Sequence, residues 1–299
     1  MKNIVSVSLG SSARNKSVNV KILDEDFCIQ RIGTDGDVLK AVSLIEEFDG
    51  KVDAFGIGGT DLYIVAGGRR YTLRDARKLA QAAQESPIVD GSGLKDTLER
   101  RVINYLHNEK IIDFTNRKIL QVCSVDRFGM AEASVKVGAD MIFGDLIFGL
   151  GIPIPLKKLS AISLAARIAG PIITRVPMRY LYPTGEKQSI NTPKYGKYYN
   201  WADIISGDFH YIKKYMPLDL TGKIILTNTV TEADIEELKK RRVKMLITTT
   251  PGFDGRSFGT NVMEAVLVAI SGKRPEELTS ADYHALLDKL NFKPRIERF

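Results

Sequence analysis

Apolar residues alternate between strand-like and helical spacing along the first third of the chain. Short apolar runs that end in glycine-rich turns predict strands at Ile4–Ser8, Phe27–Ile32 and Val52–Phe55. Apolar residues three and four positions apart predict amphipathic helices at Val38–Phe48 and Leu73–Gln84. This alternation is typical of an α/β domain.

The same alternation becomes more regular after Lys118. Strands are predicted at Ile119–Cys123, Ala139–Phe143, Ala202–Ser206, Lys223–Leu226 and Lys244–Thr248. Helices are predicted at Phe128–Val137, Tyr211–Tyr215, Glu232–Arg241, Asn261–Ile270 and Ser280–Leu290. Thr231 and either Thr279 or Ser280 are the expected N-caps of two of these helices. Connections of this length require a parallel sheet with helices on its faces.

These patterns predict two α/β domains. Residues 1–112 form a smaller, substrate-type α/β domain, and residues 113–299 form a Rossmann-like parallel-sheet domain. A TIM barrel is the alternative, since it also joins parallel strands and gathers polar loops on one face. Residues 151–200 interrupt the pattern with prolines, tyrosines and basic residues, and Tyr180–Tyr199 is predicted to be an extended loop. The segment is either a lid or oligomer contact or a packed surface excursion.

Composition narrows the class of partner. The net charge is +7, but the basic residues are dispersed as short runs and no nucleic-acid-binding motif accompanies them. An anionic small molecule is therefore the expected partner, and nucleic acid is not. No apolar stretch is long enough for a membrane span, so we expect a cytoplasmic protein. Cys28 and Cys123 lie apart without metal-ligand spacing, which predicts free thiols and no metal site.

The segment between Ile119 and Asp145 fits the frame of a dinucleotide-binding fingerprint. The glycine positions of G-x-G-x-x-G fall on Ser124, Asp126 and Gly129, and Asp145 ends the next strand about 20 residues downstream, where the ribose-binding acid is expected. An aspartate at the second position would crowd a pyrophosphate and repel it. Arg127 is a candidate to bind phosphate or to neutralise Asp126. Helix packing of Gly129 and Ala133 is the competing explanation.

Three further groups are candidates for chemistry. Thr248, Thr249, Thr250 and Pro251 follow a strand and are placed to flank a nicotinamide, although such residues also form ordinary turns. His210 beside Asp208 suits proton transfer, and its alternative is a helix-capping aspartate next to a half-exposed histidine. Lys95 and Asp96 form another candidate pair, or the start of a helix with ion pairs. P-loop, zincin and serine-hydrolase motifs are absent from the sequence.

Several segments together resemble bacterial proteins described as quinate or shikimate 5-dehydrogenase-like. They are KILQVCSVDRFGMAEA, FGDLIFGLGIPIPL, ISGDFHYIKKYMP, ILTNTVTEAD, LITTTPGFDGRSFGTNVMEA and RIGTDGD. The resemblance implies a substrate domain, a Rossmann domain, NAD or NADP, and a catalytic Lys/Asp pair. The glycine-rich loop and the Asn-Val-Thr-x-Pro-x-Lys signature of authentic enzymes are missing. Lys95 with Asp96 is the nearest equivalent of the catalytic pair.

Two function hypotheses follow. The first is NAD(P)-dependent oxidoreduction of a small hydroxy-carboxylate, with Ser124–Gly129 and Asp145 on the cofactor, Thr248–Pro251 beside the nicotinamide, and His210 with Asp208 as proton relay. The second is a Rossmann-like ligand-binding or regulatory protein for an anionic small molecule, without redox chemistry. Asp126 favours the second hypothesis. A homo-oligomer is compatible with either.

Overall fold

A computed structural model of the chain describes residues 1–66, 69–72, 74–173, 191–250, 252–253, 256–257 and 259–299. The chain divides into two units. The first unit comprises Met1–Lys95, Ala169–Gln188 and Gly259–Phe292, and the second comprises Asp96–Ile168, Ser189–Phe258 and Lys293–Phe299.

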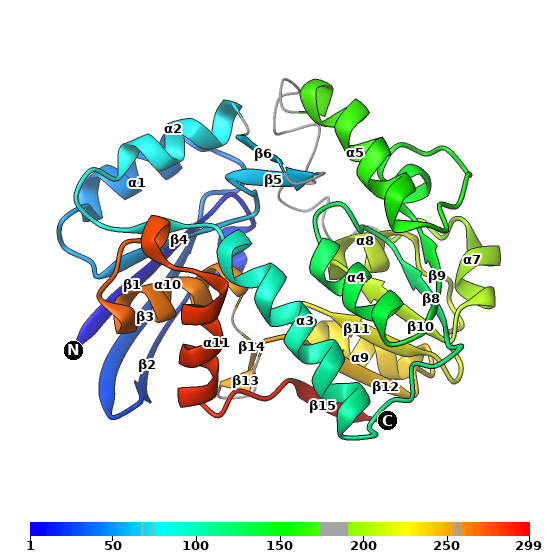
Figure 1. Cartoon of the computed structure of the whole chain (residues 1–299). Helices are drawn as coiled ribbons and strands as arrows, with labels where there is room; N and C mark the ends of the chain where they lie inside the picture. Colours follow the sequence, from blue (N-terminus) through cyan, green and yellow to red (C-terminus); the bar gives the residue numbers. More distant parts are fainter. Residues whose placement is uncertain (67–68, 73, 174–190, 251, 254–255, 258) are drawn as a thin grey trace. The chain divides into compact units, whose positions relative to one another are not determined.

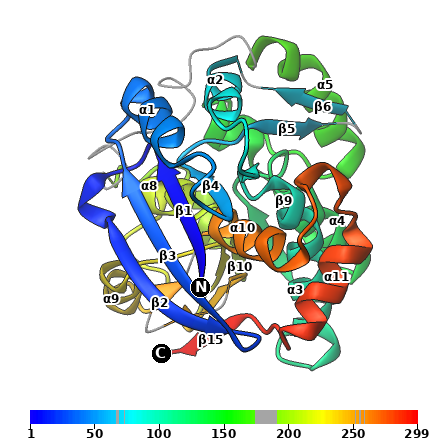
Figure 2. The same ribbon diagram turned by 90° about the vertical axis from the view of Figure 1, so that its left-hand side faces the viewer.

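The first unit is built on a five-stranded sheet in the order β2-β3-β1-β4-β7, of which Figure 2 labels β2, β3, β1 and β4. Its strands are β1 (Lys2–Ser8), β2 (Lys16–Ile22), β3 (Glu25–Gly33), β4 (Ala54–Gly58) and β7 (Ile88–Val89). Strands β3, β1, β4 and β7 are parallel, and only the edge strand β2 is antiparallel to its neighbour β3. The carboxyl ends of four strands therefore lie along one edge of this sheet.

Helices cover the first sheet because alternate strand residues are apolar. Val5, Val7, Phe55 and Ile57 pack with residues of α1 (Val38–Phe48) and α2 (Arg74–Ala82) in one buried cluster. Helix α10 (Thr260–Ser271) packs against β1 and β4. The other elements of this unit are η1 (Ser12–Arg14), the β5–β6 hairpin (Tyr63–Ala66 and Arg69–Thr72), η4 (Pro275–Glu277) and α11 (Ser280–Lys289). Helix α3 (Ser92–Asn108) begins in the first unit and continues in the second.

The second unit contains a six-stranded sheet in the order β15-β12-β11-β10-β8-β9 (Figure 1). The strands are β8 (Lys118–Gln121), β9 (Asp140–Phe143), β10 (Ile204–Gly207), β11 (Ile224–Thr227), β12 (Met245–Thr248) and β15 (Arg295–Arg298). All are parallel except the edge strand β15. Numbered along the chain, the parallel strands follow the doubly wound order 2-1-3-4-5, whose topological switch point lies between β8 and β10.

Apolar residues of β8, β10, β11 and β12 form one buried cluster with four helical elements of the second unit. They are the π-helical turn η2 (Asp145–Gly149), α7 (Gly196–Trp201), α8 (Phe209–Tyr215) and α9 (Glu232–Lys240). Helix α4 (Phe128–Lys136) contacts β9, and α5 (Leu159–Ile173) begins in the second unit and ends in the first. A short hairpin, β13 (Gly252–Phe253) with β14 (Arg256–Ser257), follows β12. In the described part of the chain, no helix combines the length and apolar character that crossing a bilayer requires.

The predicted α/β class with parallel sheets is confirmed, and most predicted helices and strands are present within a few residues of their expected bounds. Thr231 and Thr279 cap α9 and α11, each in a capping box. Asp37 caps α1, whereas the Asp35 carboxylate accepts a hydrogen bond from the Ser12 amide. The barrel alternative is wrong because both large sheets are open, with edge strands at each end.

The boundary between the units also differs from the predicted one. The division falls at Lys95 and not at residue 112, and 259–292 belong to the first unit. The reason is the packing of α10, which lies so close to β4 that a Cβ at Gly56 would be 2.9 Å from the Asn261 carbonyl oxygen. Single-sequence periodicity identifies this helix but carries no information on which sheet it covers.

Part of the predicted extended loop Tyr180–Tyr199 is helical. Residues 174–190 lie outside the described part of the chain, but residues from Gly196 form α7. Tyr198 and Tyr199 are buried in the core of the second unit, and their hydroxyls donate to the carbonyls of Pro153 and Ile212. Tyr198 and Tyr199 are thus core residues with a satisfied polar end.

Candidate functional site

The loop Ser124–Gly129 follows β8 and lies at the topological switch point of the second unit. Asp145, directly after β9, reaches this loop as the fingerprint predicts. Its Oδ1 accepts hydrogen bonds from the backbone amides of Ser124 (2.7 Å) and Val125 (2.8 Å). Burial raises the pKa of Asp145, although these amide hydrogen bonds oppose the shift. The carboxylate therefore occupies amides that a bound phosphate would use.

Arg127 belongs to this loop, and its side chain is buried in a network of ion pairs. Its guanidinium contacts Glu99, and it donates to Asp208 Oδ2 at 3.1 Å. The side chains of Arg127 and Glu99 are 2% and 1% exposed. Although burial alone would lower the pKa of Arg127, the carboxylates of Glu99, Asp208 and Asp126 hold it well above its usual range. The arginine links the loops after β8 and β10, where an open α/β sheet ordinarily holds its ligand.

The loop does not fit the pyrophosphate of a dinucleotide. Two of its amides donate to Asp145, and the Arg127 side chain is committed to buried carboxylates. Asp126 is half-buried and adds negative charge where phosphate would approach. The frame of the fingerprint is present, but its phosphate-binding groups are engaged within the protein.

Close helix packing explains the small residues Gly129 and Ala133. A Cβ at Gly129 would lie 2.6 Å from both the carbonyl oxygen and Oδ1 of Asp96 on α3. Ala133 is buried on the same helix, α4. The competing explanation for these small residues therefore has direct geometric support, because α3 and α4 approach too closely for a larger side chain at Gly129.

Asp208 and His210 are close together, and the Asp208 carboxylate makes hydrogen bonds that stabilise the fold. Asp208 caps α8, where its Oδ1 accepts the backbone amide of His210 at 2.9 Å. Its Oδ2 accepts from Arg127 and from Asn228 Nδ2 at 2.8 Å. Burial opposes ionisation, but the charges of His210 and Arg127 keep the pKa of Asp208 below its usual value. Asp208 thus stays ionised as a partner of Arg127.

Thr248, Thr249 and Thr250 are buried at the end of β12. Thr248 Oγ1 donates to the Thr250 carbonyl at 2.9 Å, and Thr250 Oγ1 donates to the Asn228 carbonyl at 3.0 Å. Thr249 Oγ1 is buried and has no hydrogen-bond partner among the described residues. Two of the three hydroxyls therefore stabilise the turn, and Pro251 lies outside the described part of the chain.

Lys95 and Asp96 form ion pairs with different partners. Lys95 Nζ lies 3.1 Å from Asp61 Oδ1 in the first unit, and both side chains are largely buried. Asp96, in the second unit, binds Arg100 one turn further along α3 at 3.0 Å. Asp61 follows β4 in the sequence Gly58-Gly59-Thr60-Asp61, so the structure supplies a Lys–Asp pair whose acid the sequence prediction missed.

Arg31 lies near the carboxyl end of β3 in the sheet of the first unit. It is not among the site residues predicted from the sequence. Its guanidinium donates to Ser8 Oγ at 3.0 Å and to the Ser11 carbonyl at 3.1 Å. Burial, together with the charge of Arg14, lowers the pKa of Arg31 to about 10. The carboxylate of Asp35 opposes part of this shift. The glycine-rich turns after β1 and β3 are the only sequence signal for this group.

A third group surrounds Glu264, which is the only charged residue of α10. Its carboxylate is 3% exposed, and Oε1 accepts the Tyr283 hydroxyl at 2.7 Å. Burial, and then the charge of Asp90, raises the pKa of Glu264 to about 7. A single acid within the apolar run of TNVMEAVLVAI is a signal that could have singled it out from the sequence.

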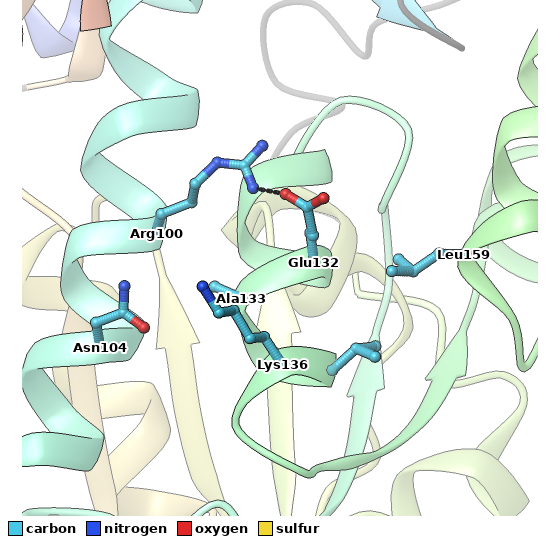
Figure 3. A pocket seen from close by; sticks show the side chains of 7 residues that line it. Arg100, Asn104, Glu132, Ala133, Lys136 and Leu159 are labelled. Carbon is cyan, nitrogen blue, oxygen red and sulfur yellow. Dashed lines mark hydrogen bonds and ion pairs between the residues drawn. The ribbon is translucent and has the colours of Figure 1, made fainter. Parts of the chain in front are cut away.

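A cavity of about 450 Å³ lies between α3 and α4 in the second unit, and its lining residues include Arg100, Asn104, Glu132, Lys136 and Leu159 (Figure 3). Arg100 and Glu132 point toward each other and form an ion pair. None of the predicted site residues except the neighbouring Ala133 lines it. Among the described residues no group of three His, Cys, Asp or Glu side chains could hold a metal, and Cys28 and Cys123 are free thiols.

Comparison with protein families places the chain. Residues 93–299 match the model described as domain of unknown function DUF8754, and residues 3–90 match the one described as domain of unknown function DUF8753. The chain belongs to the DUF8754 family. The two models meet near the start of α3, earlier than the predicted boundary at residue 112. No curated protein matches the chain.

Several solved structures are distantly similar to this chain. A sugar ABC transport substrate-binding protein from Bordetella parapertussis is 10% identical, with a TM-score of 0.38 over 93% of this chain and 82% of that one. An NAD-dependent malic enzyme from Thermotoga maritima is 11% identical, with a TM-score of 0.34 over 97% and 83%. Ornithine carbamoyltransferase from Pyrococcus furiosus is 12% identical, with a TM-score of 0.36 over 93% and 86%. At this level of similarity, none of them indicates a function.

Proposed function

We propose that the first unit binds a small hydroxy-carboxylate at the carboxyl ends of its parallel strands, without a dinucleotide. The observation that carries this proposal is the placement of Arg31 and the Lys95–Asp61 pair along one sheet edge. Arg31 lies near the end of β3, Ser8 ends β1, and Asp61 follows β4. Open α/β sheets bind their ligands at this edge.

The charges along the edge match the two ends of such a molecule. A guanidinium has five N–H donors, and Arg31 uses two of them on Ser8 and Ser11, which leaves others for a carboxylate. Lys95 donates to a hydroxyl oxygen while Asp61 accepts the hydroxyl hydrogen. Strands β3 and β4 are separated by β1, so their backbones lie about 10 Å apart at roughly 4.8 Å per strand step. The two groups therefore follow strands that are two steps apart along one edge of the sheet.

A second candidate is the NAD- or NADP-linked oxidoreductase that the resemblance to quinate or shikimate dehydrogenase-like proteins implies. The buried Lys95–Asp61 pair favours it, because an amine beside a carboxylate suits proton transfer at a hydroxyl. It requires Asp145 to release the amides of Ser124 and Val125.

A cytoplasmic location and a homo-oligomeric state are further predictions from the sequence. Light scattering after size-exclusion chromatography measures the oligomeric state.

Calorimetric titration tests the first proposal. Quinate, shikimate and malate are the probes, with inositol lacking the carboxylate and cyclohexanecarboxylate lacking the hydroxyls. We expect binding that requires both groups, and at least a tenfold loss of affinity in Arg31→Met and Lys95→Met. Lys40→Met, an exposed residue of α1, is the matched control and should bind like the wild type. Equal affinity in all variants, or binding of inositol alone, would contradict the proposal.

A further inference from the structure

We propose that Glu264 holds a proton that is coupled to Lys95, so that binding of an anionic ligand at the Lys95–Asp61 pair takes up a proton from solvent. This inference rests in part on the proposed function, because the ligand is the hydroxy-carboxylate named above. The coupling between Glu264 and Lys95 is a property of the protein alone and can be tested without ligand.

The Glu264 carboxylate of α10 packs against the start of α3. It lies against Gly93, where an added Cβ would overlap Oε1, and Gly93 is two residues before Lys95 on the same helix. Tyr283 of α11 donates to Oε1. Oε2 is buried and has no hydrogen-bond partner in the part of the chain that the structure describes. Because an unsatisfied buried carboxylate oxygen is costly when charged, Oε2 is the natural proton-binding atom.

Charged and titratable groups face Glu264 from each neighbouring element. Asp90 follows β7 and disfavours ionisation, whereas the Tyr283 hydroxyl, the Gly91 backbone amide and Lys95 on α3 favour it. Asp61 acts through its ion pair with Lys95. Helix α10 contributes no other charged residue. Among the described residues named here there are three acids and one lysine, and ionisation of Glu264 adds one negative charge to them.

This charge balance determines the direction of coupling. An anion that binds near Lys95 adds negative charge, which favours the protonated form of Glu264. By reciprocity, protonated Glu264 favours the anion, so affinity should fall as pH rises through the titration of Glu264. The proton moves from the buffer to Oε2, and no covalent bond in the ligand changes. The largest expected slope is about tenfold in affinity per pH unit.

Two measurements test the inference. The first is a pH titration of ¹³C-labelled glutamate carboxyl signals in ligand-free protein, with Glu264→Gln to assign the resonance. We expect a midpoint near 7, raised in Lys95→Met and in Tyr283→Phe, because each change removes a group that favours ionisation. A midpoint in the ordinary range for glutamate, or one that Lys95→Met leaves unchanged, would overturn the coupling.

The second measurement is calorimetry with quinate near pH 7 in two buffers of different ionisation enthalpy. Wild type should take up a fraction of one proton per quinate bound, and Glu264→Gln should take up none. Binding by wild type without proton uptake overturns the inference. If quinate does not bind but Lys95→Met shifts the Glu264 titration, the coupling is supported and the proposed function has failed.

Discussion

Replacement of Arg127 by methionine should destabilise the second unit strongly. The change leaves the buried carboxylate of Glu99 and the half-buried carboxylate of Asp208 without their shared cation. The Glu99 side chain is 1% exposed and that of Asp208 21%, so water replaces little of the lost interaction. Breaking a buried ion pair from one side costs about 3–5 kcal/mol. This is a large part of the 5–15 kcal/mol typical of a domain.

Urea unfolding at pH 7 measures this cost. Trp201, the chain's single tryptophan, lies on α7 of the second unit and reports on that unit by fluorescence. The matched control is Arg100→Met, which breaks ion pairs to Asp96 and Glu132 whose acids are about half exposed. Such pairs contribute roughly 0–1 kcal/mol. The difference between the two variants isolates the effect of burial.

A triple variant separates unpaired charge from lost packing. Glu99→Gln, Arg127→Met and Asp208→Asn together remove all three charges, and asparagine at position 208 still caps α8. We expect it to recover most of the stability lost in Arg127→Met, because no buried charge stays uncompensated. If Arg127→Met costs less than 1 kcal/mol, or no more than Arg100→Met, the buried-network argument is refuted.

Three further predictions concern stability. Gly129→Ala should lower the free energy of unfolding in urea by about 1–3 kcal/mol, because the added Cβ meets the backbone of Asp96. Alanine is the better helix former, so a gain in stability would contradict this close packing. Asp145→Ala should cost about 1–3 kcal/mol by freeing the two loop amides, whereas Asp145→Asn should keep them bonded and cost much less; equal losses would show that these hydrogen bonds contribute nothing. Glu264 has its pKa raised from 4.5 to about 7, so the stability that it contributes below pH 4.5 is lost as pH rises through 7. Glu264→Gln should therefore gain roughly 3 kcal/mol on the wild type between pH 5 and pH 8.5, and parallel pH–stability curves would refute this.

The fold could be predicted where one segment carries its own pattern. Alternation of strand and helix after Lys118 determined the parallel sheet, and Thr231 and Thr279 marked helix starts through capping chemistry that depends on nearby residues only. Strand β2 was missed because its turn to β3 uses Leu23 and Asp24 at positive φ in place of a glycine signal. Local rules fail where tertiary contacts stabilise an unusual turn.

The candidate site was predictable only in part. The fingerprint frame located Asp145 beside Ser124, because the spacing of strand, helix and strand is a local property. Lys95 was identified from the sequence but paired with Asp96, because its partner Asp61 is 34 residues away along the chain. Glu264 meets Gly93 only after the chain returns to the first unit. Such pairings depend on long-range packing that periodicity does not encode.

The most direct test of the account is a calorimetric titration of NAD, NADH, NADP and NADPH into wild-type protein and Asp126→Gly. Because Asp145 holds the loop amides and Arg127 is committed to Glu99 and Asp208, neither protein should bind any of the four. Micromolar binding of a dinucleotide by the wild type would contradict the account and make the oxidoreductase the leading function.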